Sequence, residues 1–368
     1  MLEFLYMQQL LCNSFEVAPS SATDVLLNNQ VAIKKIHRPF KRSELCQRAY
    51  LELKLLKLLR HENVSALQDV FVSFGENVYL ITQYQGMTLE QYFASTQLEE
   101  RFTKVLFYQL LRGLKYLHSA NIVHCDVKPS SILITESYDL QLTGLDNSHV
   151  AGQPVTDDWL YGNGNQCYQA PELMVGMPTY QSGIDMWAAG CIFAEMINGG
   201  PLFSEKRSTN QLYAIIRILG YLPDDLFNGL GSGNVMKYLK SLPVSERTSL
   251  RTHIKTADLE ALELIEHLLD FDPETRYPAD KALEHAYVSL YHDATDEPTS
   301  EKMWSVDDLD YVEWPVNDWK NLMYVTRIQH GTHIPIAPYL PPDSSGHCLA
   351  DSMGRRAGTE TMQRRMDC

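Results

Sequence analysis

The sequence predicts an α+β fold, with strands concentrated early in the chain and helices dominating the remainder. Two early runs, at residues 25–36 and 78–82, are rich in the Val, Ile, Leu and Tyr side chains typical of strands. Later, leucines at residues 103–119 recur with the spacing of one helix face. A third observation is the apolar run opened by Gly183, which indicates a buried helix.

The first elements can be taken in order. Residues 1–24 combine an apolar start with the loop-like run Ala-Pro-Ser-Ser-Ala-Thr, so we expect no regular structure there. Residues 25–36 predict two short strands about an Asn-Asn turn. Residues 44–60 contain neither glycine nor proline and predict a helix. The strand at 78–82 is followed by a short connector at 83–86.

The later elements are mainly helical. The stripe at residues 103–119 should face the core. Residues 132–134 and 140–142 flank a Glu-Ser-Tyr-Asp turn and predict a hairpin that presents its end to a cleft. From Pro341 onward the chain has Pro, Ser, Gly and paired arginines without periodicity, which indicates a flexible tail.

Composition limits the function classes. With 31 basic and 46 acidic side chains the net charge is −15, which disfavours a nucleic-acid or membrane-surface binder and suits basic peptide partners. The 7 cysteines are scattered without a Cys-x-x-Cys spacing, so we expect neither a disulfide framework nor a zinc site. The longest apolar run, near residues 188–196, is too short to span a bilayer. We expect a cytoplasmic protein, with nuclear entry left open.

The most specific chemistry lies at residues 121–172. This stretch contains His124, Asp126 and Lys128, and it ends with the tripeptide Ala-Pro-Glu at 170–172. It resembles the catalytic core of eukaryotic protein kinases, whose pattern is His-Arg-Asp, an asparagine, Asp-Phe-Gly and Ala-Pro-Glu. The resemblance implies a bilobal kinase fold and makes Asp126 and Lys128 the catalytic residues. It also implies two structural contacts in the large lobe, in which Asp185 supports the catalytic-loop backbone and Arg276 pairs with Glu172.

The resemblance also implies an ATP site between the lobes, with Mg²⁺ as the second cofactor. Lys34, in the run Val-Ala-Ile-Lys, would hold the nucleotide phosphates and pair with Glu52 on the following helix. The alternatives are an exposed strand lysine and a solvated helix carboxylate. The connector between the lobes would contribute a gatekeeper and adenine-facing groups, namely Thr82, Gln83, Tyr84 and Gln85. Thr88 stands where related kinases have an aspartate near the ribose.

Several departures from the family pattern affect the chemistry. Cys125 replaces the arginine, Ser131 the metal-binding asparagine, and Gly144-Leu145-Asp146 the motif Asp-Phe-Gly. The Gly-rich loop that covers the phosphates is missing, since the first glycine of the chain is Gly75. We therefore predict no metal ligand at the two family positions and strongly impaired phosphoryl transfer. Asp146 lies two residues past the lost aspartate, which leaves a displaced metal ligand as an alternative.

Dispersed motifs narrow the resemblance to the stress-activated, osmosensing branch of the mitogen-activated protein kinases, especially the fungal type. They occur at 238–243, 291–298 and 308–320, and the likeness covers about residues 30–325. It implies that Asp293, Asp296 and Glu297 form an acidic docking patch. The partners would be mitogen-activated protein kinase kinases, substrates or phosphatases with basic docking peptides. On composition alone these carboxylates could equally form a solvated turn.

The resemblance sets the expected domain boundaries. We expect a divergent N-terminus at residues 1–24, an N-lobe at 25–84 and a C-lobe at 85–287. A C-terminal extension with the docking patch should follow at 288–340, and a flexible tail at 341–368.

The activation switch of this branch is also altered. Its Thr-x-Tyr motif would fall on residues 160–162, which read Leu-Tyr-Gly, although Thr156 and Tyr161 remain phosphorylatable. The arginines that would bind the phosphates are replaced by Leu51, Cys125, Gln166 and Gln169. Because acceptors and readers are lost together, we predict that activation by phosphorylation is abandoned.

Three hypotheses follow. The first is a pseudokinase that binds pathway partners, and the second is a weak Ser/Thr kinase that uses Asp126, Lys34 and Asp146. The third is that a decaying gene or an incomplete gene prediction explains the missing Gly-rich loop.

Overall fold

The protein is described from a computed structural model of its 368 residues. The described residues are 20–24, 29–84, 86–154, 166–176, 179–204, 208–220, 250–306 and 314–329. By its internal contacts the chain divides into Met1–Arg327 and Ile328–Cys368, and the description below concerns the first unit. The predictions for Gln85 and for residues 160–162, 238–243, 308–313 and 341–368 lie outside the described residues.

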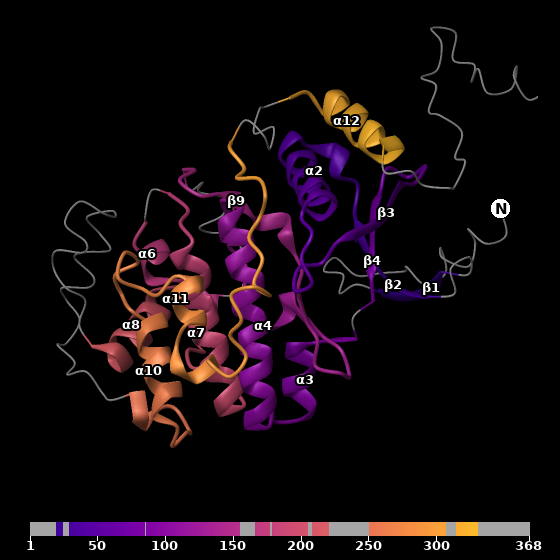
Figure 1. Cartoon of the computed structure of the whole chain (residues 1–368). Helices are drawn as coiled ribbons and strands as arrows, with labels where there is room; N and C mark the ends of the chain where they lie inside the picture. Colours follow the sequence, from indigo (N-terminus) through magenta and orange to yellow (C-terminus); the bar gives the residue numbers. More distant parts are fainter. Residues whose placement is uncertain are drawn as a thin grey trace, which may run out of the picture. The chain divides into compact units, whose positions relative to one another are not determined.

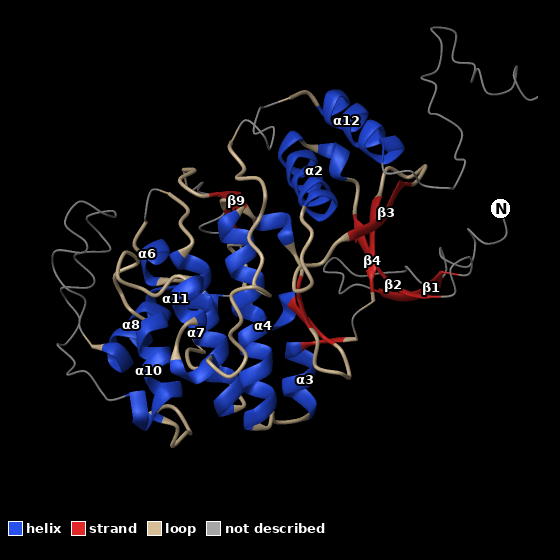
Figure 2. Cartoon of the chain, in the orientation of Figure 1, coloured by secondary structure: helices blue, strands red, loops and turns tan. Residues whose placement is uncertain are grey.

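The described strands are β1 Ser20–Asp24, β2 Asn29–Ile36, β3 Leu67–Val72, β4 Val78–Gln83, β5 Met87–Thr88, β6 Ile122–Val123, β7 Ile132–Ile134, β8 Leu140–Leu142 and β9 His149–Val150. The described helices are α2 Ser43–Leu58, α3 Leu89–Ser95, α4 Glu100–Ser119, α6 Pro171–Met174, α7 Gly183–Asn198, α8 Ser208–Leu219, α10 Leu259–Leu268, α11 Ala279–Leu283 and α12 Val316–Gln329. Strands and helices are segregated: the larger sheet stands at one end of this unit and the helices α4 to α11 make up the other (Figure 2). This confirms the predicted α+β class.

The N-terminal sheet is antiparallel with the strand order β1-β2-β4-β3 (Figure 1). In β1, Asp24 pairs with Asn29 and Ser20 pairs with Ile33. A hairpin is therefore present with its first strand at residues 20–24, outside the predicted range 25–36, and residues 25–28 lie outside the described residues. The loop expected before residue 25 is wrong for residues 20–24. Pairing with β2 satisfies the backbone groups of this polar edge strand and overrides its loop-like composition.

Helix α2 confirms the helix predicted at residues 44–60. It buries Leu53 and Leu55 completely, and it contacts β3 and a 3-10 turn at Leu145–Asn147. The helix thus links the N-terminal sheet to the segment that replaces Asp-Phe-Gly.

The helical part is built around α4 and α7. Helix α4 begins at Glu100 rather than at the predicted residue 103, and its leucine stripe is fully buried. It packs on α7 through the stacked rings of Phe107 and Phe193, whose centroids are 4.1 Å apart. None of the described helices is both long and apolar enough to cross a membrane. The apolar side chains of α7 are buried in the main hydrophobic core.

The predicted hairpin is confirmed as β7 and β8, in which Ile132 pairs with Leu142. Its strand β7 also pairs with β5, directly after the connector between the lobes. Gly86 enters this contact with φ 88°, and a Cβ there would collide with the carbonyl oxygen of Ile134. The connector thus needs a glycine at this position.

Candidate functional site

The loop at residues 124–131 contains the predicted catalytic residues and is called the catalytic loop below. Asp185 of α7 supports its backbone. Its carboxylate accepts hydrogen bonds of 2.8 Å from the backbone N–H groups of both His124 and Cys125. His118 Nε2 lies 2.9 Å from the same carboxylate, which is 1% exposed. Cys125 has a φ of 64°, which is unusual for a residue with a side chain. The buried carboxylate therefore stabilises a strained loop conformation.

A second buried contact stabilises the large lobe. Arg276 binds Glu172 through two hydrogen bonds, of 2.6 and 3.0 Å, and it also donates to the carbonyl oxygen of Gly183 at 2.7 Å. Both side chains are about 3% exposed. Together with Asp185, this pair matches the two structural contacts that the kinase resemblance implied for the large lobe.

Lys34 lies at the centre of the cleft between two carboxylates. Its Nζ is 2.8 Å from Glu52 Oε1 and 3.0 Å from Asp146 Oδ1. The structure thus forms the predicted Lys34–Glu52 pair and adds Asp146 to it. Burial alone would lower the pKa of Lys34, but the two carboxylates together raise it.

The two carboxylates of this triad differ in protonation. Burial raises the pKa of Glu52, the Lys34 ammonium opposes that effect and Asp146 adds to it, so that the pKa is about 7. Burial also opposes ionisation of Asp146, yet its contacts with Lys34 outweigh that effect and lower its pKa. Asp146 is therefore the fixed negative charge of the cleft.

Asp126 and Lys128 lie together as the resemblance implied. Lys128 Nζ is 2.7 Å from Asp126 Oδ2, and Asn147 Nδ2 donates to the same oxygen over 3.3 Å. A cavity of about 30 Å³ opens beside these residues and is also lined by Tyr168 and Gln169. Asp126 and Lys128 therefore line a small cavity together with the residues just before the Ala-Pro-Glu segment.

The family positions for Mg²⁺ do not fit a metal. Ser131 Oγ lies 3.0 Å from the carbonyl oxygen of Asp126 and 2.9 Å from that of Lys128, and it accepts the Lys128 N–H over 3.0 Å. This hydroxyl is thus committed to the loop itself, and Gly144 has no side chain to offer. Among the described residues no group of three or more His, Cys, Asp or Glu side chains is arranged to hold a metal ion.

The carboxylate of Asp146 lies next to these positions. A Cβ built on Gly144 would be 4.0 Å from Asp146 Oδ1, because the 3-10 turn at Leu145–Asn147 folds the carboxylate back. Mg²⁺ sites in proteins commonly use one or two carboxylates, with the remaining positions filled by substrate phosphates and water. The carboxylate of Asp146 fits that chemistry although the family positions do not.

The predicted hinge is partly described. Thr82 and Gln83 end β4, where Thr82 pairs with Ala32, and the Tyr84 N–H donates to the Gln30 carbonyl oxygen over 3.3 Å. Thr88 caps helix α3 through its hydroxyl, which accepts the Gln91 N–H over 3.1 Å. The adenine-facing role of these residues stays a prediction.

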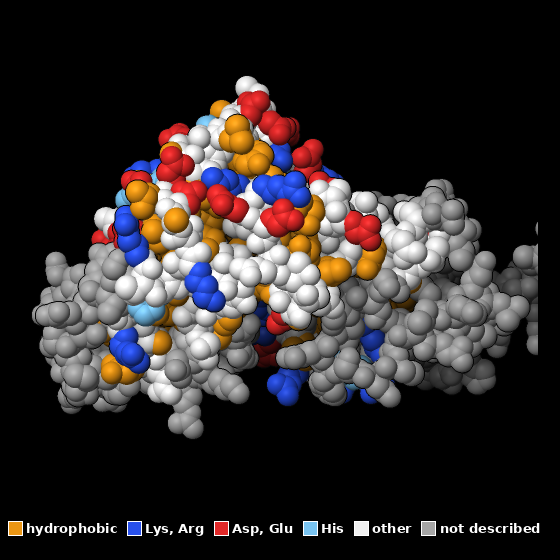
Figure 3. All heavy atoms as spheres, turned by 90° about the horizontal axis from the view of Figure 1, so that it is seen from below, with side chains coloured by type: hydrophobic (Ala, Val, Ile, Leu, Met, Phe, Trp, Pro, Cys, Tyr) orange, Lys and Arg blue, Asp and Glu red, His pale blue; other side chains and the backbone are white. Residues whose placement is uncertain are grey.

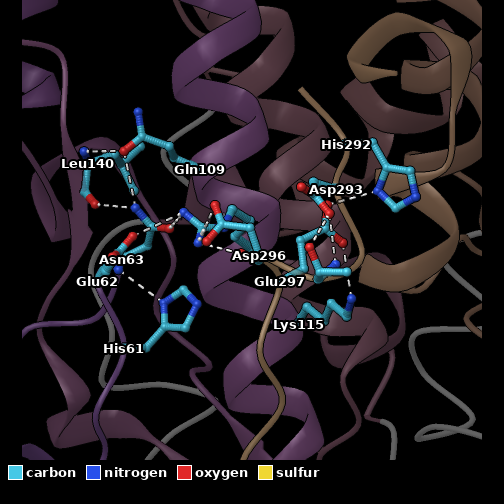
Figure 4. Close-up of polar contacts among 12 residues, drawn as sticks. His61, Glu62, Asn63, Gln109, Lys115, Leu140, His292, Asp293, Asp296 and Glu297 are labelled. Atoms are coloured by element: carbon cyan, nitrogen blue, oxygen red, sulfur yellow. Dashed lines mark hydrogen bonds and ion pairs between the residues drawn. The ribbon is translucent and has the colours of Figure 1, made fainter. Parts of the chain in front are cut away.

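The three carboxylates of the predicted docking patch have different environments. Glu297 has no exposed side-chain surface and pairs with Lys115 at 3.0 Å and His292 at 2.8 Å (Figure 4). Asp293 is exposed and accepts from the Thr295 hydroxyl. Asp296 is 68% exposed and lies 3.3 Å from Arg112. Only Asp293 and Asp296 therefore offer charge to a partner, and the docking role itself stays a prediction.

The wider surface agrees with the charge count. On the face drawn in Figure 3, acidic and basic side chains of the described residues are interspersed. A basic stripe of the kind that binds nucleic acid is not seen on that part of the described surface.

Two of the four positions expected for phosphate-reading arginines are part of the core, since Leu51 and Cys125 are both buried. The motif position 160–162 and Thr156 lie outside the described residues. The loss of activation by phosphorylation stays a prediction.

Comparison with known proteins decides the family. A family profile described as "Protein kinase domain" matches residues 20–288. The chain is 45% identical over 306 residues to mitogen-activated protein kinase hog-1 of Neurospora crassa, covering 83% of this chain and 84% of that protein. It is 42% identical over 328 residues to HOG1 of Exserohilum turcicum, covering 89% of this chain and 97% of that protein. The chain is a member of the mitogen-activated protein kinase family. The resemblance to the fungal stress-activated branch is thereby confirmed.

Two features of this kinase-family site were not predicted from its sequence. Asn147 contacts Asp126, a contact that depends on the 3-10 turn rather than on any motif. Lys115 and Arg112 neutralise part of the docking patch from α4. Their spacing of three on one helix was the available signal, since it places both on the same face.

Proposed function

We propose that this kinase-family chain is a signalling protein of the stress-activated branch that acts by binding pathway partners, with strongly impaired phosphoryl transfer. The observation that carries the proposal is the state of the two family metal positions. Ser131 uses its hydroxyl within the catalytic loop, and Gly144 has no side chain. We further propose a cytoplasmic location, with nuclear entry left open, because scattered cysteines without a disulfide or zinc pattern fit a reducing compartment.

The expected impairment can be given a scale. In active kinases Mg²⁺ neutralises the charge that develops on the transferring phosphoryl group. If each missing preorganised contact costs about 3 kcal/mol, two of them lower a turnover of ~10 s⁻¹ to ~10⁻³ s⁻¹ or less. Asp126 and Lys128 can still position a hydroxyl group, but neither compensates for that loss.

The partners that we propose are upstream kinases, substrates or phosphatases with basic docking peptides. Asp293 and Asp296 supply exposed negative charge, whereas Glu297 holds the patch together through Lys115 and His292. The charge reversal Asp293→Lys with Asp296→Lys should weaken binding of a basic docking peptide at least tenfold. Fluorescence anisotropy measures this directly, with Glu274→Lys plus Glu284→Lys as a control of equal charge change on exposed sites. Equal affinity of both double variants for the peptide would contradict the docking proposal.

The phosphoryl-transfer part needs a separate experiment. Thermal unfolding of the purified chain with ATP, with and without Mg²⁺, reports ligand binding to the folded state by mass action. Phosphotransfer to a generic Ser/Thr substrate should be about 10⁴-fold or more below that of an active relative. A turnover near ~10 s⁻¹ would sink the proposal of impaired catalysis.

A weakly active kinase is the second candidate, and one specific contact favours it. Asp146 lies 3.0 Å from Lys34, close to the place of the lost aspartate. Any real phosphotransfer should then disappear in Asp126→Ala. Activity that persists in this variant would reveal a contaminating kinase.

A further inference from the structure

The segment Gly144 to Asn147 forms a compact turn that returns two polar side chains to the cleft. Gly144 adopts φ 80°, a left-handed conformation that starts the 3-10 turn Leu145–Asn147. Leu145 is fully buried and anchors the turn, while Asp146 and Asn147 remain partly exposed. The turn therefore places Asp146 against Lys34 of β2 and Asn147 against Asp126 of the catalytic loop.

Asp146 and Asn147 each bind a residue that the kinase resemblance assigns to the active site. Asp146 Oδ1 binds Lys34 Nζ over 3.0 Å. The Asn147 amide donates from Nδ2 to Asp126 Oδ2 over 3.3 Å, which leaves its carbonyl oxygen as the acceptor that it can offer. A carboxylate and an amide oxygen are the two ligand types that the family pattern places at the residues replaced here by Gly144 and Ser131.

Ser131 explains how the exchange is compatible with the loop. Its hydroxyl, next to the carbonyl oxygens of Asp126 and Lys128, ties the loop to itself. The Ser131 hydroxyl thus stabilises the loop conformation without an asparagine at this position. The amide ligand can then come from a different residue without loss of the loop conformation.

The buried carboxylate of Glu52 adds a second observation. Its Oε2 has no hydrogen-bond partner although the residue is 2% exposed, while its Oε1 binds Lys34. One lysine is therefore shared by two carboxylates. The Oε2 atom of Glu52 is thus a buried acceptor without a hydrogen-bond partner, next to the lysine that also binds Asp146.

We propose that Asp146 and Asn147 form a displaced divalent-cation site that holds the metal of a metal–nucleotide complex, in place of Gly144 and Ser131. This proposal rests on the proposed function in that the chain keeps the kinase fold, and it adds that the site beside Lys34 accepts a nucleotide. It explains how a nucleotide can bind with its cation while the geometry for rapid phosphoryl transfer is lost.

The test uses the full chain, Mn²⁺ as the cation and ADP as the nucleotide. Electron paramagnetic resonance of free Mn²⁺ gives the affinity of the ternary complex without any need for catalysis. Asp146→Asn should weaken Mn²⁺ binding at least tenfold. Asp139→Asn, the same charge change on the exposed turn of the β7–β8 hairpin, should leave it unchanged.

A second variant tests the amide. Asn147→Asp places a carboxylate beside Asp126, which is unfavourable alone but favourable when a cation lies between them. It should therefore tighten Mn²⁺ binding in the presence of ADP by a few fold, while a purely structural Asn147 would give weaker or equal binding. Cooperative thermal unfolding of each variant without ligand establishes that it is folded.

The outcomes separate the proposals. Unchanged Mn²⁺ affinity in Asp146→Asn, or Mn²⁺ that does not bind with ADP to the native chain, overturns the displaced site. Neither result affects the docking-peptide measurement, so partner binding stands or falls independently.

Discussion

The catalytic loop has two sides that differ in how far they follow the kinase pattern. On the side of the large lobe, Asp185 and the pair of Glu172 with Arg276 make the buried contacts that the family resemblance implied. On the nucleotide side, Ser131 and Gly144 lack the expected ligands. The large-lobe side keeps the contacts that the resemblance implied and is called the intact side. The nucleotide side has other residues at the metal positions and is called the rebuilt side.

The difference teaches which contacts the fold itself requires. Loss of Asp185 would leave the buried backbone N–H groups of His124 and Cys125 without this acceptor, and loss of Glu172 would leave the buried charge of Arg276 unpaired. A metal ligand at the cleft contributes to binding and rate but little to folding. Sequence change on the nucleotide side is therefore compatible with a stable lobe, whereas change on the other side is not.

The largest expected effect tests the intact side. Arg276→Met removes the partner of Glu172 and leaves a buried, uncompensated carboxylate, so the free energy of unfolding should fall by about 3–5 kcal/mol. Chemical denaturation measures this value. Arg101→Met, which breaks an exposed pair with Glu99, should change stability by about 0.5 kcal/mol or less. Similar losses in both variants would mean that the buried pair of Glu172 and Arg276 matters no more for stability than an exposed ion pair.

The next prediction concerns Glu52, the buried partner of Lys34 on the nucleotide side. Its pKa is raised to about 7, so the folded state binds a proton more tightly than the unfolded chain. The stability that this carboxyl contributes is present at low pH and is lost as pH rises from about 4.5 to about 7. Glu52→Gln cannot titrate and should escape that loss.

The measurement is the difference in unfolding free energy between Glu52→Gln and the native chain. From pH 5 to pH 8, the free energy of unfolding of Glu52→Gln should rise relative to that of the native chain by on the order of 2 kcal/mol. A difference that is independent of pH would mean that Glu52 is ionised throughout and fully neutralised by Lys34.

The sequence was a good guide to elements with strong periodicity or a motif. Helix α4, the β7–β8 hairpin and the Lys34–Glu52 pair follow from local patterns and from the family resemblance. Strand β1 was missed because its stability comes from pairing with β2 and not from its own polar residues. Strand pairing across a loop is a tertiary effect that composition cannot show.

The site was less predictable where a side chain acts through a turn. That Asp146 reaches Lys34 depends on the backbone of Gly144, and that Glu297 is buried depends on Lys115 from a distant helix. The sequence identified both acids but not their surroundings. Exposure and partner choice are set by packing between segments, which single-sequence patterns do not encode.

The smallest effect tests the rebuilt side, at Ser131. Its hydroxyl accepts the Lys128 N–H and faces two carbonyl oxygens, so Ser131→Ala should lower the free energy of unfolding by about 1 kcal/mol. Because this hydroxyl is committed to the loop, the same variant should keep the native affinity for Mn²⁺ with ADP. A Ser131→Ala variant that keeps its stability but binds Mn²⁺ more weakly would place the metal at the family position after all. The nucleotide side would then differ from the family pattern in ligand type, with its site in the original place.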